Sequence, residues 1–392
     1  MDTPVKQSVI TSNAVNVLNT AKNTLNNVKT AANNTVNTTN TIKNSIQNKV
    51  TNTVNVVKTK IKTVEAGQAL IILLVLLAIV YFLYSISYTY RVGNILNTMD
   101  TWVDYLEINP RYIIDKKLTS KPLRDFYVAS AFRPYVAKYQ MMDYCSLEIL
   151  EKTIACGPRM LYIDIFNDSL QETANPVVSV GYEKGNWKLT LNTLPFDDVC
   201  KTIANTAFRS GYVDNYYDPL FLVLNLNLNN NLYSTNKVQE SIIKYFKPRL
   251  LESRYSNADP NVNMGNVKIG ELMEKVIIIC SDGYQNTKLE ELVNSSWVND
   301  NINHIPFDTL GGNLGIENSE TLQLDADELT SFNSRFLSIV HPPNNSFYTY
   351  TYPDFRFYET GCQFVCMNYN KVDDNTIQYV ERFRMSSFIL HL

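Results

Sequence analysis

The chain has 392 residues, of which 45% are hydrophobic and 11% aromatic. This length is enough for two domains or for one large domain with an extension, and the apolar fraction allows a sizeable core. The formal net charge of −3 at pH 7 is not that of a typical nucleic-acid-binding protein, so we expect no nucleic-acid partner.

Residues 1–65 differ in composition from the rest of the chain. They contain eight lysines but no arginine, aromatic residue or cysteine. Apolar residues recur there at the spacing of an amphipathic helix: Val15, Leu18, Leu25, Val28, Ala32, Val36, Ile46, Val50, Val54, Val57, Ile61 and Val64. Because the segment is rich in Asn and Thr, which are poor helix formers, this helix would be marginal in water. We expect it to lie on a membrane surface, to pair in a loose helical bundle, or to be a disordered tail.

Residues 66–90 contain no charged side chain. At about 1.5 Å per residue, this helix would be long enough to cross a hydrocarbon core of ~30 Å. Aromatic residues, which favour the membrane interface, gather at its carboxyl end: Tyr81, Tyr84, Tyr88 and Tyr90. The segment is therefore predicted to be a transmembrane helix with the lipid bilayer as its partner. It is too long, and too far from the amino terminus, for a cleaved signal peptide.

The charges on either side of this segment predict its orientation. Three lysines precede it closely, namely Lys58, Lys60 and Lys62, whereas Arg91 stands alone on the other side. The positive-inside rule then places the amino terminus in the cytosol. The larger carboxyl-terminal part would face a lumen, the exterior or the space inside a viral envelope. Sequons that start at Asn167, Asn294 and Asn344 are compatible with that side.

Beyond residue 100, short apolar runs bounded by turn residues alternate with helical patterns. The runs include "FYVASA", "RMLYIDIF", "PLFLVLNLNL", "EKVIIIC", "FLSIVHP" and "CQFVCMNYN". Such runs between helices predict parallel strands that are buried on both faces. Their number and order approach an α/β fold of the (β/α)8 TIM-like type, in which functional residues lie at the carboxyl ends of the strands.

Several of these runs carry a family resemblance. The stretch "FNSRFLSIVHP", followed by "YETGCQFVCMNYN", resembles the Y half of eukaryotic-type phosphoinositide-specific phospholipase C. The stretches "ILEKTIACGPRMLYIDIFND" and "NPVVSVG" resemble its X half, and order and spacing agree over roughly residues 116–392. The resemblance implies an X-like half-barrel over 116–283, an X–Y linker over 284–326 and a Y-like half-barrel over 327–392. Residues 91–115 would connect them to the membrane span.

The resemblance also implies where catalytic groups would lie. The family mechanism needs two histidines and a Ca²⁺ ion, which takes oxygen ligands. The histidine positions fall on Phe132 and Val180, so neither histidine is present. The positions of the calcium ligands fall on Arg133, Tyr162, Asp164 and Asn225.

Only Asp164 keeps the residue type of the family at the calcium position, while Asn225 offers one neutral oxygen. Arg133 brings a permanent positive charge that would repel Ca²⁺ and could pair with Asp164. We therefore expect a structural ion pair and no cofactor, with Tyr135 beside it in a remodelled polar mouth. The alternative is that Asp164 still binds a metal. The phosphate-binding lysines of the family fall around Ile279 to Ser281, where the chain has no basic residue.

Histidines and cysteines offer few replacements for the missing groups. His304 lies in the presumed linker, His391 lies near the chain end, and His341 ends a predicted strand. His341 is thus the candidate substitute acid or base; the other interpretation is a partly buried histidine in place of the family's tyrosine. The six cysteines lack metal-ligand spacing and are expected to be buried thiols, with a disulfide as the alternative on an oxidising side.

These observations lead to competing hypotheses about function. The first is a membrane-anchored phospholipase C-like pseudoenzyme whose barrel binds a lipid headgroup or a protein. The second is an active phosphoinositide phosphodiesterase with a rewired, calcium-independent site that uses Arg133, Asp164 and His341. The third is a structural component of a viral or organellar membrane, since the Asn-rich, Lys-over-Arg composition suits an AT-rich genome such as that of a large DNA virus.

Overall fold

The fold is described from a computed structural model of the chain. The residues it describes are 45–53, 66–108, 112–182, 186–298, 302–307, 326–343, 347–349, 351–353 and 355–391. They fall into two compact units, Met1–Tyr84 and Ser85–Leu392, which we treat separately. The predictions for residues 1–44 and 54–65, and for the sequon at Asn344, lie outside the described residues.

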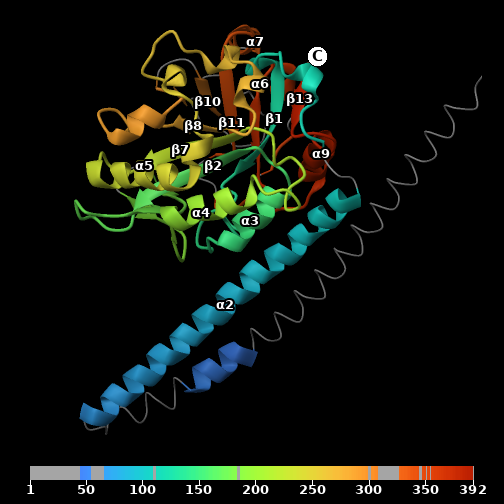
Figure 1. The fold of residues 1–392 in the computed structure, drawn as a ribbon. Coiled ribbons are helices and arrows are strands. Elements are labelled where there is room, and N and C mark those ends of the chain that lie inside the picture. The colour runs from blue at the N-terminus through green and yellow to red at the C-terminus, as the bar shows by residue number, and fades with distance from the viewer. Residues whose placement is uncertain are drawn as a thin grey trace, which may run out of the picture. The chain divides into compact units, whose positions relative to one another are not determined.

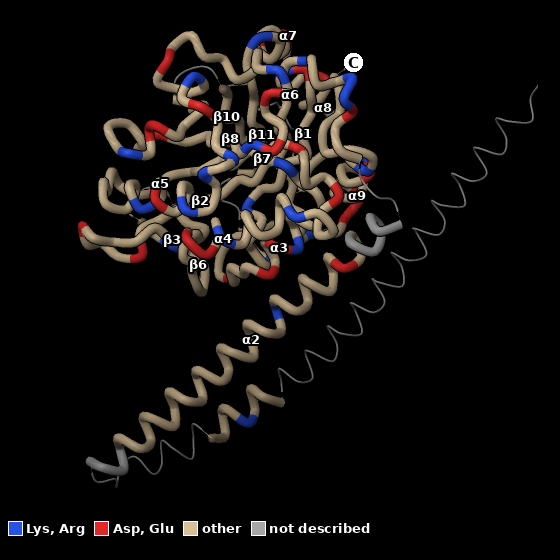
Figure 2. The backbone as a smooth tube through the Cα atoms, viewed as in Figure 1, with Lys and Arg blue, Asp and Glu red and all other residues tan. Residues whose placement is uncertain are grey.

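The predicted membrane span is part of α2 (Ala66–Ile108), a single helix of 43 residues. Its segment Leu70–Trp102 is long and apolar enough to cross a membrane, judged by length and composition. Figure 2 shows that charged residues occur only on the second half of this helix. A shorter helix, residues 45–53, has exposed side chains along its whole length.

The second half of α2 belongs to the second unit and packs against it. Apolar side chains on one stripe are buried there: Val92, Ile95, Met99 and Trp102. Trp102 donates its indole N–H to the carbonyl of Tyr369 (3.3 Å), and Arg91 pairs with Asp143 (3.3 Å). The four buried apolar residues are spaced three and four positions apart, as on a helix face that packs against a core.

The second unit is a nearly closed barrel of parallel strands in the order β10-β11-β12-β1-β2-β7-β8-β9 (Figure 1). The strands are β1 (Phe126–Phe132), β2 (Met160–Asn167), β7 (Leu220–Asn227), β8 (Val276–Cys280), β9 (Ser295–Ser296), β10 (Ile302–Pro306), β11 (Leu337–His341) and β12 (Phe364–Met367). The register sets Phe132 beside Tyr162 and Asp164 beside Asn225. The predicted TIM-like fold is confirmed, and its register brings Phe132, Tyr162, Asp164 and Asn225 together at one end.

Helices cover the outside of this barrel. They are α3 (Leu147–Ala155), α4 (Phe196–Thr206), α5 (Leu232–Phe246), α6 (Ile269–Leu272), α7 (Ala326–Asn333), α8 (Phe355–Glu359) and α9 (Asp374–Arg382). Side chains cap several of them: Ser146 accepts from the first turn of α3, Asn231 from that of α5 and Asp373 from that of α9. Such caps satisfy backbone N–H groups that have no partner inside the helix.

Alternate residues of the strands build two separate cores. Side chains such as Val128, Met160 and Ile339 fill the barrel interior, whereas Ala129, Leu161 and Val340 belong to the layer between barrel and helices. This alternation follows from the two-residue period of a strand. It explains why the runs read as continuously apolar, since both faces are buried.

Short antiparallel strands extend the sheet or form a separate two-stranded sheet. β3 (Pro176–Val178) pairs with β2 and with β6 (Leu194–Pro195), while β4 (Gly181–Tyr182) pairs with β5 (Trp187–Lys188). β13 (Phe388–Leu390) pairs with the amino-terminal part of β1.

Two barrel strands come from the segment 284–326, which the sequence assigned to an X–Y linker. β9 pairs with β8, and β10 pairs with β11 over its full length from Ile302 to Pro306. The predicted linker therefore includes residues that belong to the barrel, namely those of β9 and β10. The run "INHIP" has only two apolar residues with proline at its end, so it lacks the continuous apolar character of the other strands.

The cysteines and two of the sequons are inside the molecule. All six cysteines are free and buried, which agrees with the expectation of buried thiols. Asn167 and Asn294 have exposed fractions of only 5% and 6%. The Asn294 amide accepts from the N–H of Ile278 (2.9 Å) and donates to the carbonyl of Tyr255 (3.2 Å). In the folded chain these sequons are therefore not accessible acceptor sites.

Candidate functional site

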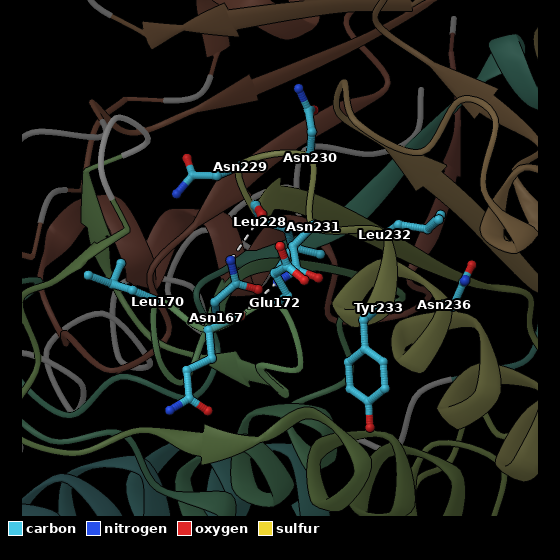
Figure 3. Close-up of a pocket in the computed structure, with 11 residues that line it drawn as sticks. Asn167, Leu170, Glu172, Leu228, Asn229, Asn230, Asn231, Leu232, Tyr233 and Asn236 are labelled. Carbon is cyan, nitrogen blue, oxygen red and sulfur yellow. Dashed lines mark hydrogen bonds between the residues drawn. The ribbon is translucent and has the colours of Figure 1, made fainter.

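Two neighbouring hollows lie at the carboxyl ends of β2, β7 and β8. The larger has a volume of about 630 Å³ and is bounded by the end of β2, the loop that follows it, and the β7–α5 loop (Figure 3). We call it the asparagine pocket; it is lined by Asn167, Leu170, Gln171, Glu172, Leu228, Asn229, Asn230, Asn231, Leu232, Tyr233 and Asn236. The smaller, about 280 Å³, shares the β7–α5 loop and reaches Asn225, Ser281 and Trp297. The sequence did not predict these hollows.

The residues predicted from the sequence lie deeper in the barrel end. β1 finishes at Phe132, and Arg133 then takes a left-handed backbone conformation with a φ of 47°. Its N–H donates to the carbonyl of Tyr162 (3.0 Å) on the next strand, which holds the turn in place. A left-handed φ is uncommon for a residue with a side chain, so this turn is strained and directs Arg133 into the barrel end.

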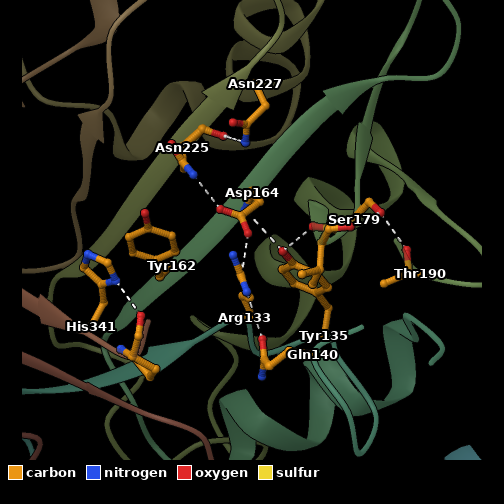
Figure 4. Close-up of polar contacts among 12 residues, drawn as sticks. Arg133, Tyr135, Gln140, Tyr162, Asp164, Ser179, Thr190, Asn225, Asn227 and His341 are labelled. Atoms are coloured by element: carbon orange, nitrogen blue, oxygen red, sulfur yellow. Dashed lines mark hydrogen bonds and ion pairs between the residues drawn. The ribbon is translucent and has the colours of Figure 1, made fainter. Parts of the chain in front are cut away.

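Arg133 and Asp164 form the expected ion pair, with Nε and Oδ2 2.5 Å apart and both side chains 1% exposed. Asn225 donates its amide N–H to the other carboxylate oxygen of Asp164 (2.8 Å), as Figure 4 shows. Arg133 also donates to Gln140 (3.1 Å). Tyr135 accepts from the Asp164 N–H (3.2 Å) and donates to the carbonyl of Ser179 (2.8 Å). The polar mouth is thus a closed network of hydrogen bonds.

This network does not fit a calcium ion. A calcium site needs several oxygen atoms directed at one point. Here both oxygens of Asp164 face donors, the guanidinium of Arg133 and the amide N–H of Asn225. Among the described residues, no three His, Cys, Asp or Glu side chains are grouped so that they could hold a metal ion. The donor set therefore argues against metal-assisted attack at this position.

Stacked rings fill the barrel end beside the ion pair. We call them the aromatic plug; its members are Phe132, Tyr162, Trp297, His304 and His341. Ring centroids of the two histidines are 4.1 Å apart, and Trp297 stacks on His304 at 4.4 Å. The ring centroids of Phe132 and Tyr162 are 5.0 Å apart. The guanidinium carbon of Arg133 lies 4.6 Å from the ring centroid of Phe132. The two strands β10 and β11 therefore supply imidazoles that pack as core aromatics do.

Burial keeps both plug histidines neutral. It lowers the pKa of His341 to about 4 and holds the pKa of His304 well below its usual value of 6.5. His341 Nδ1 lies 2.7 Å from the carbonyl of Pro342, so Nδ1 carries the proton and donates it. Its Nε2 is buried and has no partner among the described residues. His341 is 1% exposed, so a substrate in solution does not meet its ring in this arrangement.

Of the remaining predicted positions, Val180 and His391 lie apart from the plug, whereas His304 belongs to it. Val180 is fully buried after β3 and belongs to the outer core, not to the barrel interior that contains Phe132. His391 lies next to β13, where its N–H donates to the carbonyl of Asp125 (2.6 Å) at the amino end of β1. His304 was assigned to a linker but forms part of the plug, where its Nε2 lies 3.0 Å from the Tyr162 hydroxyl.

Comparison with known proteins agrees with this architecture. Residues 119–281 match the profile of the family described as phosphatidylinositol-specific phospholipase C, X domain. No curated protein sequence matches the chain significantly. The solved structure of L. pealei PLC21 is similar with a TM-score of 0.55 at 15% identity, over 70% of this chain and 38% of that one. For S. officinalis PLC21 the TM-score is 0.54 at 15% identity, over 70% and 37%.

The chain therefore spans well under half the length of these two proteins, and identities of 15% establish the fold alone. The matched segment 119–281 includes β1, β2, β7 and β8. Arg133 directly follows β1, while Asp164 lies on β2 and Asn225 on β7. Residues 119–281 are therefore similar to an X domain of phosphatidylinositol-specific phospholipase C, and they lie within a nearly closed barrel that has the fold of the two solved structures.

Proposed function

We propose that the chain is a single-pass, membrane-anchored phospholipase C-like protein that does not hydrolyse phosphodiesters. Its barrel would serve as a binding or structural module, and its span would replace a separate membrane-targeting domain. The observation that carries this proposal is the filled barrel end, where Phe132 of the aromatic plug and the Arg133–Asp164 pair stand at positions to which the family resemblance assigns a catalytic histidine and calcium ligands.

Membrane anchoring rests on a different part of the chain. The residues of α2 between Leu70 and Val80 include many large apolar side chains that are mostly exposed, for example Ile71 at 62% and Val80 at 62%. Such a surface is stable only when lipid or protein covers it. The proposed topology has the amino terminus in the cytosol and the barrel on the lumenal or exterior side, from the lysines that precede the span. A viral or host-derived membrane fits the composition.

The test is hydrolysis by the full chain. Purified protein is reconstituted into vesicles that contain phosphatidylinositol and its phosphorylated forms, and released inositol phosphates are measured with calcium and with a chelator. We expect no release above that of empty vesicles in either condition. Release that persists after repurification and is lost in His341→Gln, but kept in the control His391→Gln, would establish the rewired phosphodiesterase instead.

A further inference from the structure

The asparagine pocket has a lining that differs from the rest of the barrel end. Amide side chains from three segments border it: Asn167 and Gln171 near the end of β2, Asn229 to Asn231 after β7, and Asn236 on α5. The volume of about 630 Å³ is within the range of ~300–1,000 Å³ that is usual for small-molecule sites. The pocket is open to solvent and lies beside the plug, so a ligand could enter without displacing it.

Asn167 provides the strongest sign of a missing ligand. Its side chain is 5% exposed, and its Nδ2 donates to the carbonyl of Leu228 (2.9 Å). This bond fixes the amide so that Oδ1 must be the acceptor. Oδ1 is buried in the pocket wall and has no partner among the described residues. Because a buried acceptor without a donor costs free energy, a ligand that brings a hydroxyl group would stabilise it.

The rest of Asn167 is held firmly. Its N–H donates to the side-chain oxygen of Asn186 (3.0 Å), and its carbonyl accepts from Nζ of Lys188 (2.6 Å). These contacts fix the backbone of Asn167, and the bond from Nδ2 to Leu228 fixes the side chain that carries the unpaired Oδ1.

The opposite rim is also well defined. Asn229 and Asn230 have φ values of 49° and 57°, a left-handed conformation that asparagine tolerates better than most residues. Asn231 accepts from the N–H of Ser234 (3.0 Å) and donates to the carbonyl of Gln171 (3.2 Å), which ties the two loops together. The exposed amides of Asn229 and Asn230 remain at the entrance.

The charge of the lining selects against phosphate. Among the described residues that line the asparagine pocket there is no lysine or arginine, and Glu172 is the one charged residue. Asp282 adds a second acid in the smaller hollow. Amide groups donate and accept in pairs, as hydroxyl groups do, so they suit a neutral ligand with several hydroxyls. Tyr233, 42% exposed, offers an aromatic wall.

We propose that the asparagine pocket binds a neutral sugar ring, carried either by a glycolipid or by a glycan chain. This inference deepens the proposed binding role of the barrel and rests on it. The Oδ1 atom of Asn167 would accept a hydrogen bond from a ring hydroxyl, and the amides of Asn229 and Asn230 would bond to further hydroxyls.

The first experiment uses the labelled full chain in a polyoxyethylene detergent, because alkyl glycoside detergents would compete. The protein is applied to an array of immobilised neutral and acidic oligosaccharides and to a surface with immobilised inositol 1-phosphate. We expect binding to at least one neutral sugar and weaker binding to the phosphate. Tighter binding to inositol 1-phosphate than to any neutral sugar, or no binding above background either to the array or to vesicles with a neutral glycosyl lipid, would overturn the proposal.

Variants tie the binding to the pocket. Asn167→Leu removes the acceptor and is expected to weaken affinity by about tenfold, the effect of one hydrogen bond of ~1.4 kcal/mol. Asn230→Gly keeps the left-handed turn, removes a rim amide and provides a variant that folds normally. Glu172→Lys is expected to increase binding to inositol 1-phosphate. The matched control Glu291→Lys, on the exposed turn Lys288–Leu292, is expected to leave the affinity for both ligands unchanged. Wild-type sugar affinity in both asparagine variants would contradict the site.

Vesicles separate the two sources of the sugar. Binding to vesicles with a neutral glycosyl lipid, but not to soluble oligosaccharide of the same sugar, identifies a glycolipid, and the reverse identifies a glycan chain. Failure of sugar binding leaves the hydrolysis test unaffected, so this inference and the proposed function fail separately.

Discussion

The barrel end has two halves that differ in how their polar groups are satisfied. On the side of β1, β2, β10 and β11, rings and an ion pair fill the space, and Arg133 and Asp164 satisfy each other. Toward β7 and α5, the surface is hollow, and the side-chain oxygen Oδ1 of Asn167 has no partner among the described residues. The same strand β2 contributes Asp164 to the filled half and Asn167 to the hollow half. Polar groups at one end of the same barrel can therefore be closed off in one half and left open in the other.

The largest effect is expected in the filled half. Asp164→Asn leaves the buried guanidinium of Arg133 without a counter-charge, which costs about 3–5 kcal/mol of unfolding free energy. Denaturant titration of the full chain, followed by near-ultraviolet circular dichroism, measures this loss. In the hollow half, Asp282→Asn removes an exposed acid and should change stability by less than about 0.5 kcal/mol. Equal losses in the two variants would remove the distinction between the halves.

Lowering the pH should also reduce the stability of the filled half. The pKa of His341 is lowered by burial to about 4, so the unfolded chain binds its proton at a higher pH than the folded chain. Stability is therefore full above about pH 6.5 and falls as the pH drops toward 4, by roughly 3 kcal/mol in total. Denaturation midpoints across this window measure it. His341→Phe should reduce the dependence, and His391→Gln should not; an unchanged profile in His341→Phe would contradict this origin.

Restoring the family's histidines tests whether the filled half blocks chemistry. The double variant Phe132→His, Val180→His is expected to release no inositol phosphate, because Arg133 still pairs with Asp164. It should also be less stable by about 1–3 kcal/mol, since two imidazoles would be buried without prepared partners. Release assays and denaturation of the same preparation measure both. Calcium-dependent release of inositol phosphate would show that the Arg133–Asp164 pair does not prevent Ca²⁺ from binding.

The smallest stability effect is expected at the rim of the hollow half. Asn230→Gly retains the left-handed turn and should alter the unfolding free energy by no more than about 0.5 kcal/mol. A larger loss in denaturant titration would mean that this rim is built for stability and not for a ligand.

The sequence predicted the strands well and the hollow not at all. Runs such as "RMLYIDIF" are continuously apolar because both faces of β2 are buried, so the pattern alone indicates a parallel strand. The pairing of Arg133 with Asp164 could be inferred because the resemblance placed both at adjacent strand ends. The sequence did not predict β10 as a strand, because Asn303 and His304 interrupt its apolar run.

The aromatic plug could not be read from the sequence, because its members lie far apart along the chain. Phe132, Trp297 and His341 meet only through the register of the closed sheet. The asparagine pocket was hidden for another reason: in a chain rich in asparagine, the few that line a hollow do not stand out. In the sequence Asn167 stands out only as the start of a sequon, whereas in the fold it is a buried residue in the wall of the asparagine pocket.

The buried sequons have a consequence for biosynthesis. Oligosaccharide transfer acts on extended chain as it enters the secretory lumen, before the barrel has closed. A glycan on Nδ2 of Asn294 or Asn167 would need space that the folded chain does not have, because both side chains are buried against Ile278, Tyr255 and Leu228. If the barrel lies on the lumenal side, as proposed above, folding and glycosylation would compete for the same two side chains. The yield of native protein would then depend on which of the two is faster.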